Sequence, residues 1–318
     1  MRERVVKVTD IPREEWLQYR RTGIGGSDSS TIVGLNPYSS LFYLYNDKLG
    51  LLPEKNDTEA MRQGRDLEQY VADRWMERTG KRCKRNNYMW RSTEHPCMLA
   101  DIDREVVGEN AGLECKTTSV YNHSDFQNGE IPPTYYVQCM HYMAVMGFDR
   151  MYLAVLVLNS GFYDFVIERD EAEISALIPQ EEEFWLLVEA QEPPPVDGSD
   201  ATLDALRKLY PRECPEEYSM PLIGSEYDTE LSELQEVQNT IRELQKIADG
   251  KKASIMAEMG DAPRAETGCF TVSWQSQART TLDTKRLKKD HPEIFKQYAK
   301  TTEARVFRAK RKKEEQAV

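Results

Sequence analysis

The stretch from Met98 to Arg169 constrains the fold more than any other part of this chain. It contains four strand-like runs around one helix-like run, in the order 98–107 and 112–118 (strands), 133–147 (helix), 151–159 and 161–169 (strands). The helix begins after a Pro-Pro pair and ends at Gly147, which are ordinary helix boundary signals. Strands and helices alternating in this way predict an α/β fold, specifically an α+β mixed sheet flanked by helices.

The residues before this stretch predict mostly helices. These are a helix at 12–21, a second helix capped by Ser27 or Asp28, a helix at 38–49, a longer helix at 58–80, and one strand at 83–89. Gly80 is the expected end of the long helix. Residues 1–192 are therefore predicted to form the core domain.

The C-terminal third differs in composition and predicts a separate appendage. Three consecutive prolines at 193–195 cannot continue a helix, so residues 193–225 are predicted to connect the core to residues 226–318. The appendage shows an a/d-like apolar pattern interrupted by Lys251: Leu234, Val237, Ile241, Leu244, Ala248 and Ile255. The pattern predicts a coiled-coil hairpin arm or a helix lying on the core, followed by a small strand at 268–275 and a basic helix.

Composition excludes several classes of protein. In 318 residues, 40% are hydrophobic and 30% charged, as in ordinary globular proteins, and no run approaches the roughly 18 apolar residues of a membrane span. Because the N-terminus also lacks the apolar core of a signal peptide, we expect a cytoplasmic protein without a membrane partner. Six scattered cysteines without a CxxC pair indicate reduced thiols and no zinc or iron–sulfur site: Cys83, Cys97, Cys115, Cys139, Cys214 and Cys269.

The net charge of −12 is unusual for a nucleic-acid-binding protein, because phosphate binding rests on positive charge. The charge is unevenly distributed, however. Residues 279–313 hold 13 Lys and Arg against 4 Asp and Glu. Net charge therefore does not exclude DNA as a partner.

Glu114 and Lys116 are the first candidates for chemistry. Alternation along a strand places both side chains on one face, with Leu113 and Cys115 on the other. Asp103 on the neighbouring strand is expected to approach Glu114, and two adjacent carboxylates call for a hard divalent cation. With a lysine that orients or helps to deprotonate water, or balances phosphoryl charge, this predicts a Mg²⁺ site for phosphodiester hydrolysis. The alternative is a surface strand pair with solvated charges.

Four segments occur in an order that resembles a known family: "RRTGIGGSDSSTIVGLNPY", "GRDLE", "ADIDREVVGENAGLECKT" and "YYVQCMHYM". The chain resembles the PD-(D/E)XK nucleases of the lambda-exonuclease type, and most closely the YqaJ-like viral recombinases, over about residues 12–170. The resemblance implies a restriction-endonuclease-like core and Mg²⁺, for which Mn²⁺ substitutes.

The resemblance also implies site residues. The helix glutamate falls on Glu68, the metal-binding aspartate on Asp103, the motif acid on Glu114 and the catalytic lysine on Lys116, with the backbone carbonyl of Cys115 as an additional metal ligand. Asp101 competes with Asp103, because both lie on the same strand face; Asp103, nearer the turn, is preferred.

DNA-binding residues follow from the same resemblance. Gln138 and Tyr135 match positions that contact the reacting DNA end, although Gln138 would also suit the polar face of an amphipathic helix. The string "RRTGIGGSDSS" matches the part that receives a 5′-phosphate, with Arg21 as its guanidinium and Ser27, Ser29 and Ser30 as unranked hydroxyl candidates. The alternative is an ordinary glycine turn.

The expected activity is a Mg²⁺-dependent 5′→3′ exonuclease on linear double-stranded DNA that leaves 3′ overhangs for phage-type recombination. The resemblance implies double-stranded DNA ends, a single-strand annealing protein and a homotrimer as partners, in a bacterial host cell. Two alternatives remain open: a structure-specific or restriction-like endonuclease with the same metal site, and a catalytically inactive scaffold that binds DNA ends.

Overall fold

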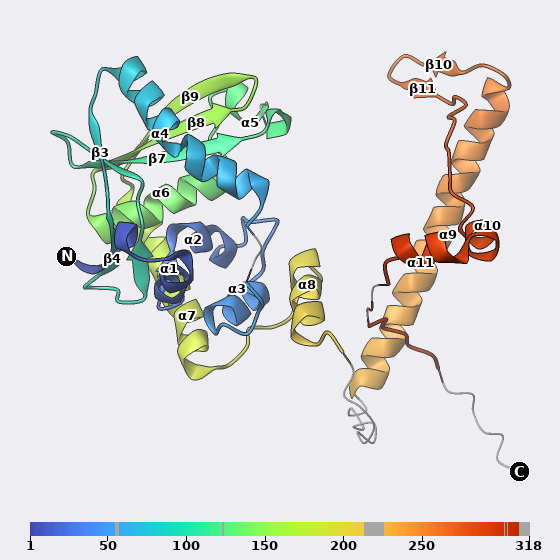
Figure 1. Ribbon diagram of the computed structural model, residues 1–318, viewed down its shortest axis with the longest axis horizontal. Helices are drawn as coiled ribbons and strands as arrows, with labels where there is room; N and C mark the ends of the chain where they lie inside the picture. The colour runs from blue at the N-terminus through green and yellow to red at the C-terminus, as the bar shows by residue number, and fades with distance from the viewer. Residues whose placement is uncertain (55–56, 123, 213–225, 302, 304, 312–318) are drawn as a thin grey trace, which may run out of the picture. The chain divides into compact units, whose positions relative to one another are not determined.

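The computed structural model describes residues 1–54, 57–122, 124–212, 226–301, 303 and 305–311 (Figure 1). The chain divides into two units, Met1–Pro211 and Arg212–Val318, and each is described by itself. None of the helices in the described ranges combines the length and apolar character that a membrane span requires. Cys214, Lys312 and Lys313, which entered the predictions above, lie outside the described residues.

A five-stranded mixed sheet is the centre of the first unit, as the sequence predicts. Its strands lie in the order β3 (Cys83–Arg85), β6 (Arg104–Val106), β7 (Ala111–Thr118), β8 (Arg150–Val157) and β9 (Gly161–Glu168). The pairs are antiparallel except β7 and β8, which run parallel and are joined through helix α6 (Pro133–Met146). A parallel neighbour needs a crossover of this kind, which explains why the helix stands between these two strands.

Strand β8 shows how the sheet is covered on both faces. Its residues alternate: Leu153 and Val155 belong to the cluster that contains α6, while Tyr152 and Ala154 pack with helix α4 (Glu59–Thr79). Trp75 of α4 is fully buried against Tyr152, with ring centroids 5.1 Å apart. Because a strand presents successive side chains to opposite faces, a strand covered on both faces needs the continuous apolar run seen here.

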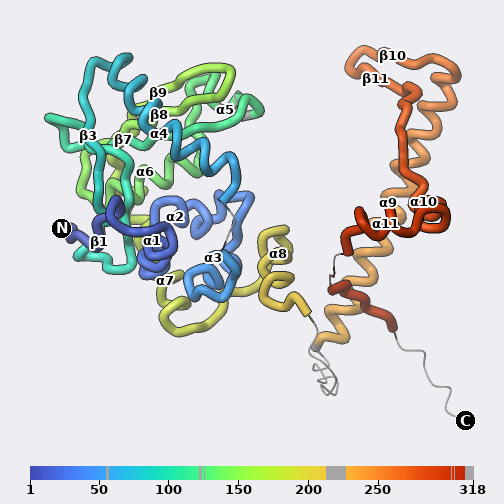
Figure 2. The backbone as a smooth tube through the Cα atoms, viewed as in Figure 1, coloured from blue at the N-terminus to red at the C-terminus, as the bar shows by residue number. Residues whose placement is uncertain are grey.

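A second, four-stranded sheet lies beside the first one and corrects two predicted strands. Its order is β1 (Arg2–Lys7), β4 (Tyr88–Ser92), β5 (Met98–Ala100) and β2 (Ile24–Gly25), so the N-terminal strand, labelled close to the N-terminus in Figure 2, lies at an edge of this sheet. The predicted strand 83–89 is therefore wrong as one strand, because it divides between β3 and β4. Asn86 causes the break, since its side-chain oxygen accepts the Tyr88 N–H at 3.0 Å.

The predicted strand 98–107 is divided in the same way, between β5 and β6. Residues 101–103 lie between these two strands, and two of their side chains form hydrogen bonds there. Asp101 accepts a hydrogen bond from the Trp16 indole, and Asp103 accepts one from the backbone N–H of Cys115. The chain thus passes from one sheet to the other at the two candidate metal ligands.

Three further predicted helices of the first unit are present with corrected boundaries: α1 (Arg13–Arg20), α2 (Gly26–Ile32) and α3 (Leu41–Lys48). The unit also contains elements for which no range was predicted: α5 (Ser124–Gln127), α7 (Glu171–Ala190), α8 (Asp200–Leu209) and the 3-10 helices η1 (Val8–Asp10) and η2 (Val120–Asn122). The predicted cap of α2 is wrong: Gly25 is the N-cap, and Asp28 reaches back from the third helical position to its N–H at 2.9 Å. Helix α3 starts later than predicted, because the Ser40 hydroxyl accepts the Tyr43 N–H.

Helix α8 lies inside the predicted connecting segment. Its Ala205 is buried with Phe42 and Tyr43, and its Thr202 hydroxyl donates to the Ser40 hydroxyl at 2.8 Å. Part of the segment 193–225 is therefore packed on α3, and residues 213–225 lie outside the described part of the chain.

The second unit consists of one long helix, a hairpin and two short helices. Its elements are α9 (Glu226–Met259), β10 (Arg264–Glu266), β11 (Thr271–Ser273), α10 (Thr284–Asp290) and α11 (Pro292–Tyr298). The predicted small strand is β11, which pairs antiparallel with β10. The prediction of a single basic helix is wrong, because Pro292 lacks the N–H that would continue α10 and starts α11 instead.

Candidate functional site

Three polar side chains form one hydrogen-bonded group between β7 and α6. The Lys116 ammonium lies 2.7 Å from Glu114 Oε1 and donates to Gln138 Oε1 at 2.9 Å. The Gln138 amide donates to the same Glu114 oxygen at 2.7 Å. Glu114 and Lys116 thus share a strand face, as alternation predicts, and α6 supplies the amide that joins them.

Asp103 lies next to this group because of the strand register. Arg104 of β6 pairs with Leu113 of the antiparallel strand β7. The next pair in this register is therefore Asp103 and Glu114. Asp103 Oδ2 accepts the Cys115 N–H at 2.7 Å. The structure therefore brings Asp103, Glu114 and Lys116 together.

Glu68 reaches the same region from helix α4. Its carboxylate accepts from the Arg104 guanidinium at 2.5 Å, and Arg104 also donates to the Asp103 carbonyl oxygen. The Arg104 side chain is buried. Burial lowers the pKa of its guanidinium, but the hydrogen bond and charge of Glu68 outweigh burial and raise that pKa. Glu68 is thus close to the site, where its carboxylate is paired with Arg104.

The electrostatic environment favours an added cation beside Asp103. Burial, together with the charges of Glu114 and Glu68, raises the pKa of Asp103 well above its ordinary value. Burial lowers the pKa of Lys116, but the charge and hydrogen bond of Glu114 outweigh it and raise that pKa. The second Glu114 oxygen, Oε2, is buried and has no hydrogen-bond partner among the described residues. An orphaned carboxylate oxygen of this kind needs a partner such as a metal ion.

The donor set fits Mg²⁺ better than a transition metal. In the described part of the chain, no three His, Cys, Asp or Glu side chains converge as a set that could hold a metal ion. Asp103 and Glu114 supply two hard carboxylates, and Mg²⁺ typically binds to one or two carboxylates and completes its shell with water and substrate phosphate. The Cys115 N–H donates to Asp103, and the N–H and C=O of one strand residue point to the same side, so its carbonyl is compatible with a third oxygen ligand.

Asp101 has a different environment from Asp103. Its Oδ2 accepts the indole N–H of Trp16 at 2.8 Å, and its backbone carbonyl accepts the Tyr142 hydroxyl at 3.1 Å. Burial raises the pKa of Asp101. Asp101 thereby fixes helix α1 to the end of β5, whereas Asp103 stands beside Glu114.

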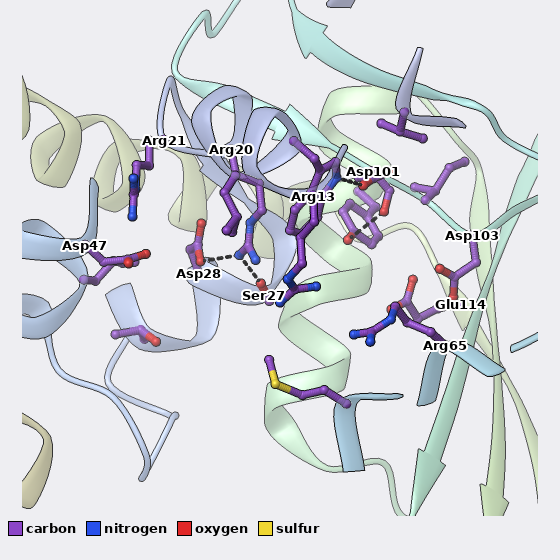
Figure 3. Close-up of a pocket in the computed structure, with 18 of the residues that line it drawn as sticks. Arg13, Arg20, Arg21, Ser27, Asp28, Asp47, Arg65, Asp101, Asp103 and Glu114 are labelled. Atoms are coloured by element: carbon purple, nitrogen blue, oxygen red, sulfur yellow. Dashed lines mark hydrogen bonds and ion pairs between the residues drawn. The ribbon is translucent and has the colours of Figure 1, made fainter. Parts of the chain in front are cut away.

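Figure 3 shows the cavity that these carboxylates line. It has a volume of about 780 Å³, its lining includes Glu68, and Figure 3 shows Asp103 and Glu114 side by side in it. Its other residues include five arginines: Arg13, Arg20, Arg21, Arg65 and Arg85. A cavity that joins carboxylates to guanidinium groups suits a phosphodiester with a bound metal ion.

A second charged group surrounds Asp28. Arg20 donates to Ser27 Oγ at 2.8 Å and to Asp28 Oδ1 at 2.9 Å, as the dashed lines in Figure 3 mark. The buried Lys48 ammonium donates to Asp28 Oδ2 at 2.6 Å. Burial opposes the ionisation of Asp28, but Lys48 and Arg20 outweigh it and lower its pKa. This group of Arg20, Ser27, Asp28 and Lys48 is called the arginine wall below.

The sequence-predicted phosphate residues divide by position. Ser27 is exposed and lines the cavity, whereas Ser29 and Ser30 are buried in α2 and do not line it. Arg21 lines the cavity, and Figure 3 shows its side chain apart from Ser27. Tyr135 of α6 lies beneath Lys116, whose ammonium is 5.2 Å from the ring centroid.

Sequence reasoning missed Arg20 and Trp16. The Arg20 guanidinium lies 5.3 Å from the Trp16 ring centroid, and both side chains line the cavity. Their spacing of four residues on a predicted helix was the available signal, because it places both on one helix face. Arg13 and Arg65 were also missed, since their approach to the cavity depends on how separate helices pack.

A buried ionic pair links helix α6 to helix α7. His141 Nδ1 lies 2.9 Å from Glu181 Oε1 of α7, and its Nε2 lies 2.8 Å from the Leu99 carbonyl of β5. Burial lowers the pKa of His141, but Glu181 outweighs it and raises that pKa. Both partners accept hydrogen bonds, so a protonated imidazole satisfies them together.

The chain is similar to known proteins of one family. Residues 15–149 match the model of the YqaJ-like viral recombinase domain. The chain is 36% identical over 309 residues to the uncharacterised protein YqaJ of Bacillus subtilis (strain 168), covering 96% of each chain.

Two solved structures are also similar. The alkaline exonuclease of Laribacter hongkongensis is 22% identical, with a TM-score of 0.48, over 56% of this chain and 94% of that chain. A phage related exonuclease from Haemophilus somnus 129PT is 13% identical, with a TM-score of 0.43, over 53% of this chain and 96% of that chain.

Proposed function

Because this chain belongs to the YqaJ-like viral recombinase family, we propose that it is a metal-dependent deoxyribonuclease acting on the ends of linear double-stranded DNA. The observation that carries the proposal is the group of Asp103, Glu114 and Lys116 around the buried Glu114 carboxylate, whose second oxygen has no hydrogen-bond partner among the described residues, in an arginine-lined cavity. Carboxylates and a lysine in this arrangement suit phosphodiester hydrolysis.

Asp103, Glu114 and the Cys115 carbonyl would hold Mg²⁺, with Mn²⁺ as a substitute. When bound, the ion would lower the pKa of a water molecule and polarise the scissile phosphate. The two carboxylates stay close because Cys115 N–H binds one and Gln138 binds the other. Their positions are therefore set before DNA arrives, which reduces reorganisation during the reaction.

Lys116 and Gln138 prepare the opposite side of the reacting phosphate. Lys116 remains an ammonium because Glu114 stabilises its charge, so it orients the attacking water or balances charge that develops on phosphoryl oxygens. Gln138 forms hydrogen bonds with both Lys116 and Glu114, and its side-chain N–H also donates to the Tyr142 hydroxyl at 3.2 Å. Glu68 keeps Arg104, and through it the Asp103 backbone, in place.

The arginine wall would receive a terminal 5′-phosphate. Arg20 is already directed at the exposed Ser27 hydroxyl, and Arg21 lines the same cavity. A phosphate held there, with the scissile bond at Asp103 and Glu114, gives 5′→3′ digestion of one strand. Such digestion leaves 3′ overhangs for a single-strand annealing protein, and a homotrimeric ring would retain DNA despite the net charge of −12.

One gel assay tests the proposal. Purified full-length chain is incubated with linear duplex carrying a 5′-phosphate or a 5′-hydroxyl, and with closed circular duplex, in Mg²⁺ or EDTA. We expect Mg²⁺-dependent loss of linear duplex that is fastest with the 5′-phosphate, and an intact circle. Glu114→Gln is the inactive control, because it keeps the shape of the side chain but removes its charge.

Each other outcome favours an alternative. Cleavage of the circle indicates an endonuclease with the same metal site. Binding of linear ends without cleavage in either Mg²⁺ or Mn²⁺ indicates an inactive end-binding scaffold, and digestion in EDTA contradicts the metal site itself.

A further inference from the structure

Helix α9 carries an apolar stripe that the other described elements of the second unit leave largely exposed. It spans 34 residues, and four of the five large side chains in the stripe, Val237, Ile241, Leu244 and Ile255, are 48–59% exposed. Their spacing of three and four residues places them at alternating a and d positions of a heptad repeat. A helix of this length with an exposed a/d stripe is built to pack against another helix.

We propose that α9 pairs with α9 of a second copy of this chain in an antiparallel coiled coil. In antiparallel pairs, an a residue of one helix faces a d residue of the other. If Ile241 faces Leu244 of the second copy, Val237 faces Ala248 and Leu234 faces Lys251. This pairing centres the two-fold axis between Arg242 and Glu243, which is also the midpoint of α9. The register that pairs the apolar side chains is therefore also the register in which the two helices overlap along their full length.

Charge separates antiparallel from parallel pairing. Three d positions outside the apolar centre of the stripe are charged: Glu230, Lys251 and Glu258. In a parallel pair each would face its own copy, which places like charges together inside the seam. In the antiparallel pair Lys251 lies one turn from Glu230 of the second copy, so opposite charges meet.

The charge of the whole helix has the same asymmetry. Residues 226–243 contain six acids and one base, whereas 244–259 contain three bases and two acids. Antiparallel pairing places the acidic half of each helix against the more basic half of the other. Charge at such positions commonly sets the orientation of coiled coils.

This pairing is separate from a ring formed by the nuclease core. A core trimer whose arms pair would contain six chains, and a monomeric core would give a dimer. In either case the wild-type mass is an even multiple of 36.8 kDa. Removing the stripe should therefore halve the mass without affecting the core.

Light scattering on the full chain is the first test. The variant Ile241→Glu with Leu244→Glu should have half the wild-type mass, while Ser232→Glu with Asn239→Glu, both at f positions on the outer face of the same helix, should remain near the wild-type mass. Circular dichroism checks that the helix remains. An unchanged mass in the stripe variant, or a wild-type mass of one or three chains, overturns the proposal and indicates that the stripe packs within its own chain or in a trimer.

Cysteine cross-linking is the second test and decides orientation. Val237→Cys and Ala248→Cys variants are oxidised separately and after mixing, with wild type as the background control for native cysteines. Antiparallel pairing predicts a cross-linked dimer only in the mixture. Cross-linking of each variant by itself indicates a parallel pair, and no cross-link in any sample excludes the proposed seam.

Discussion

The two charged regions of the cavity have opposite charge balance. At one end, Asp103 and Glu114 share a single neighbouring lysine, and one buried Glu114 oxygen has no partner among the described residues. At the arginine wall, the single carboxylate of Asp28 has two cations, Lys48 and Arg20. A surplus of buried negative charge attracts a cation, and a surplus of positive charge attracts an anion. This difference supports the proposal that one cavity holds both Mg²⁺ and a phosphate.

The largest expected effect comes from removing charge at the acidic end. Asp103→Asn should reduce cleavage by about 10³-fold or more, because it removes a metal ligand from a site that has few. Asp101→Asn is the matched control and should remain within about 10-fold of wild type, since its carboxylate serves Trp16. Single-turnover rates with Mg²⁺ measure both. A larger loss in Asp101→Asn than in Asp103→Asn would reverse the assignment of the metal ligand.

The next largest effect separates the lysine from the metal. Lys116→Met should reduce turnover by about 10²-fold, because the ammonium no longer balances charge in the transition state. Titration calorimetry with Mn²⁺ should show that metal binding persists, since both carboxylates remain. Turnover near the wild-type rate would remove Lys116 from the mechanism.

A smaller effect is expected at the arginine wall. Arg20→Gln should reduce the preference for a 5′-phosphate over a 5′-hydroxyl by about 10-fold, because one charge-assisted hydrogen bond is lost. The matched variant Arg21→Gln tests the arginine next to it in sequence. Initial rates on both duplexes give the preference. If only Arg21→Gln changes it, the phosphate lies beside Arg21 and not beside Ser27.

The smallest effect concerns the buried pair behind both regions. The pKa of His141 is raised above its ordinary value of 6.5 in the folded chain, so its stabilisation is complete below pH 6.5 and is lost as pH rises through the folded pKa. The free energy of unfolding should therefore fall above pH 6.5, by at most about 1.4 kcal/mol per pH unit.

Urea unfolding between pH 6 and 9 measures this slope. The double variant His141→Gln with Glu181→Gln is the control, because it removes the titrating pair but keeps groups that form hydrogen bonds. An equal slope in the control would show that another group causes the pH dependence.

The predicted elements and the observed structure differ mainly where one segment serves two sheets. The prediction for 98–107 correctly placed strand residues at both ends of this segment, but the chain changes sheets between Ala100 and Arg104. Local patterns do not reveal such a change, because both halves have strand-like residues. The same reasoning applies to 83–89, where Asn86 ends one strand and begins the turn to the next.

The sequence by itself determined, through the alternation of side chains along a strand, which residues of β7 share a face. Glu114 and Lys116 share a face, and Leu113 and Cys115 pack toward α4, because successive side chains of any strand point in opposite directions. The helix boundaries at Gly80 and Gly147 were similarly determined, since both glycines adopt the left-handed conformation that ends a helix.

Only the tertiary structure decided between neighbouring candidates of the same chemical type. Asp101 and Asp103 are equivalent by alternation, yet Trp16, 85 residues away in sequence, binds Asp101 while Asp103 lies beside Glu114. Arg20 and Arg21 are adjacent, yet Arg20 alone of the two binds Ser27 and Asp28. Periodicity is a local property of the backbone, whereas these choices depend on contacts between distant segments, which exist only after the core has packed.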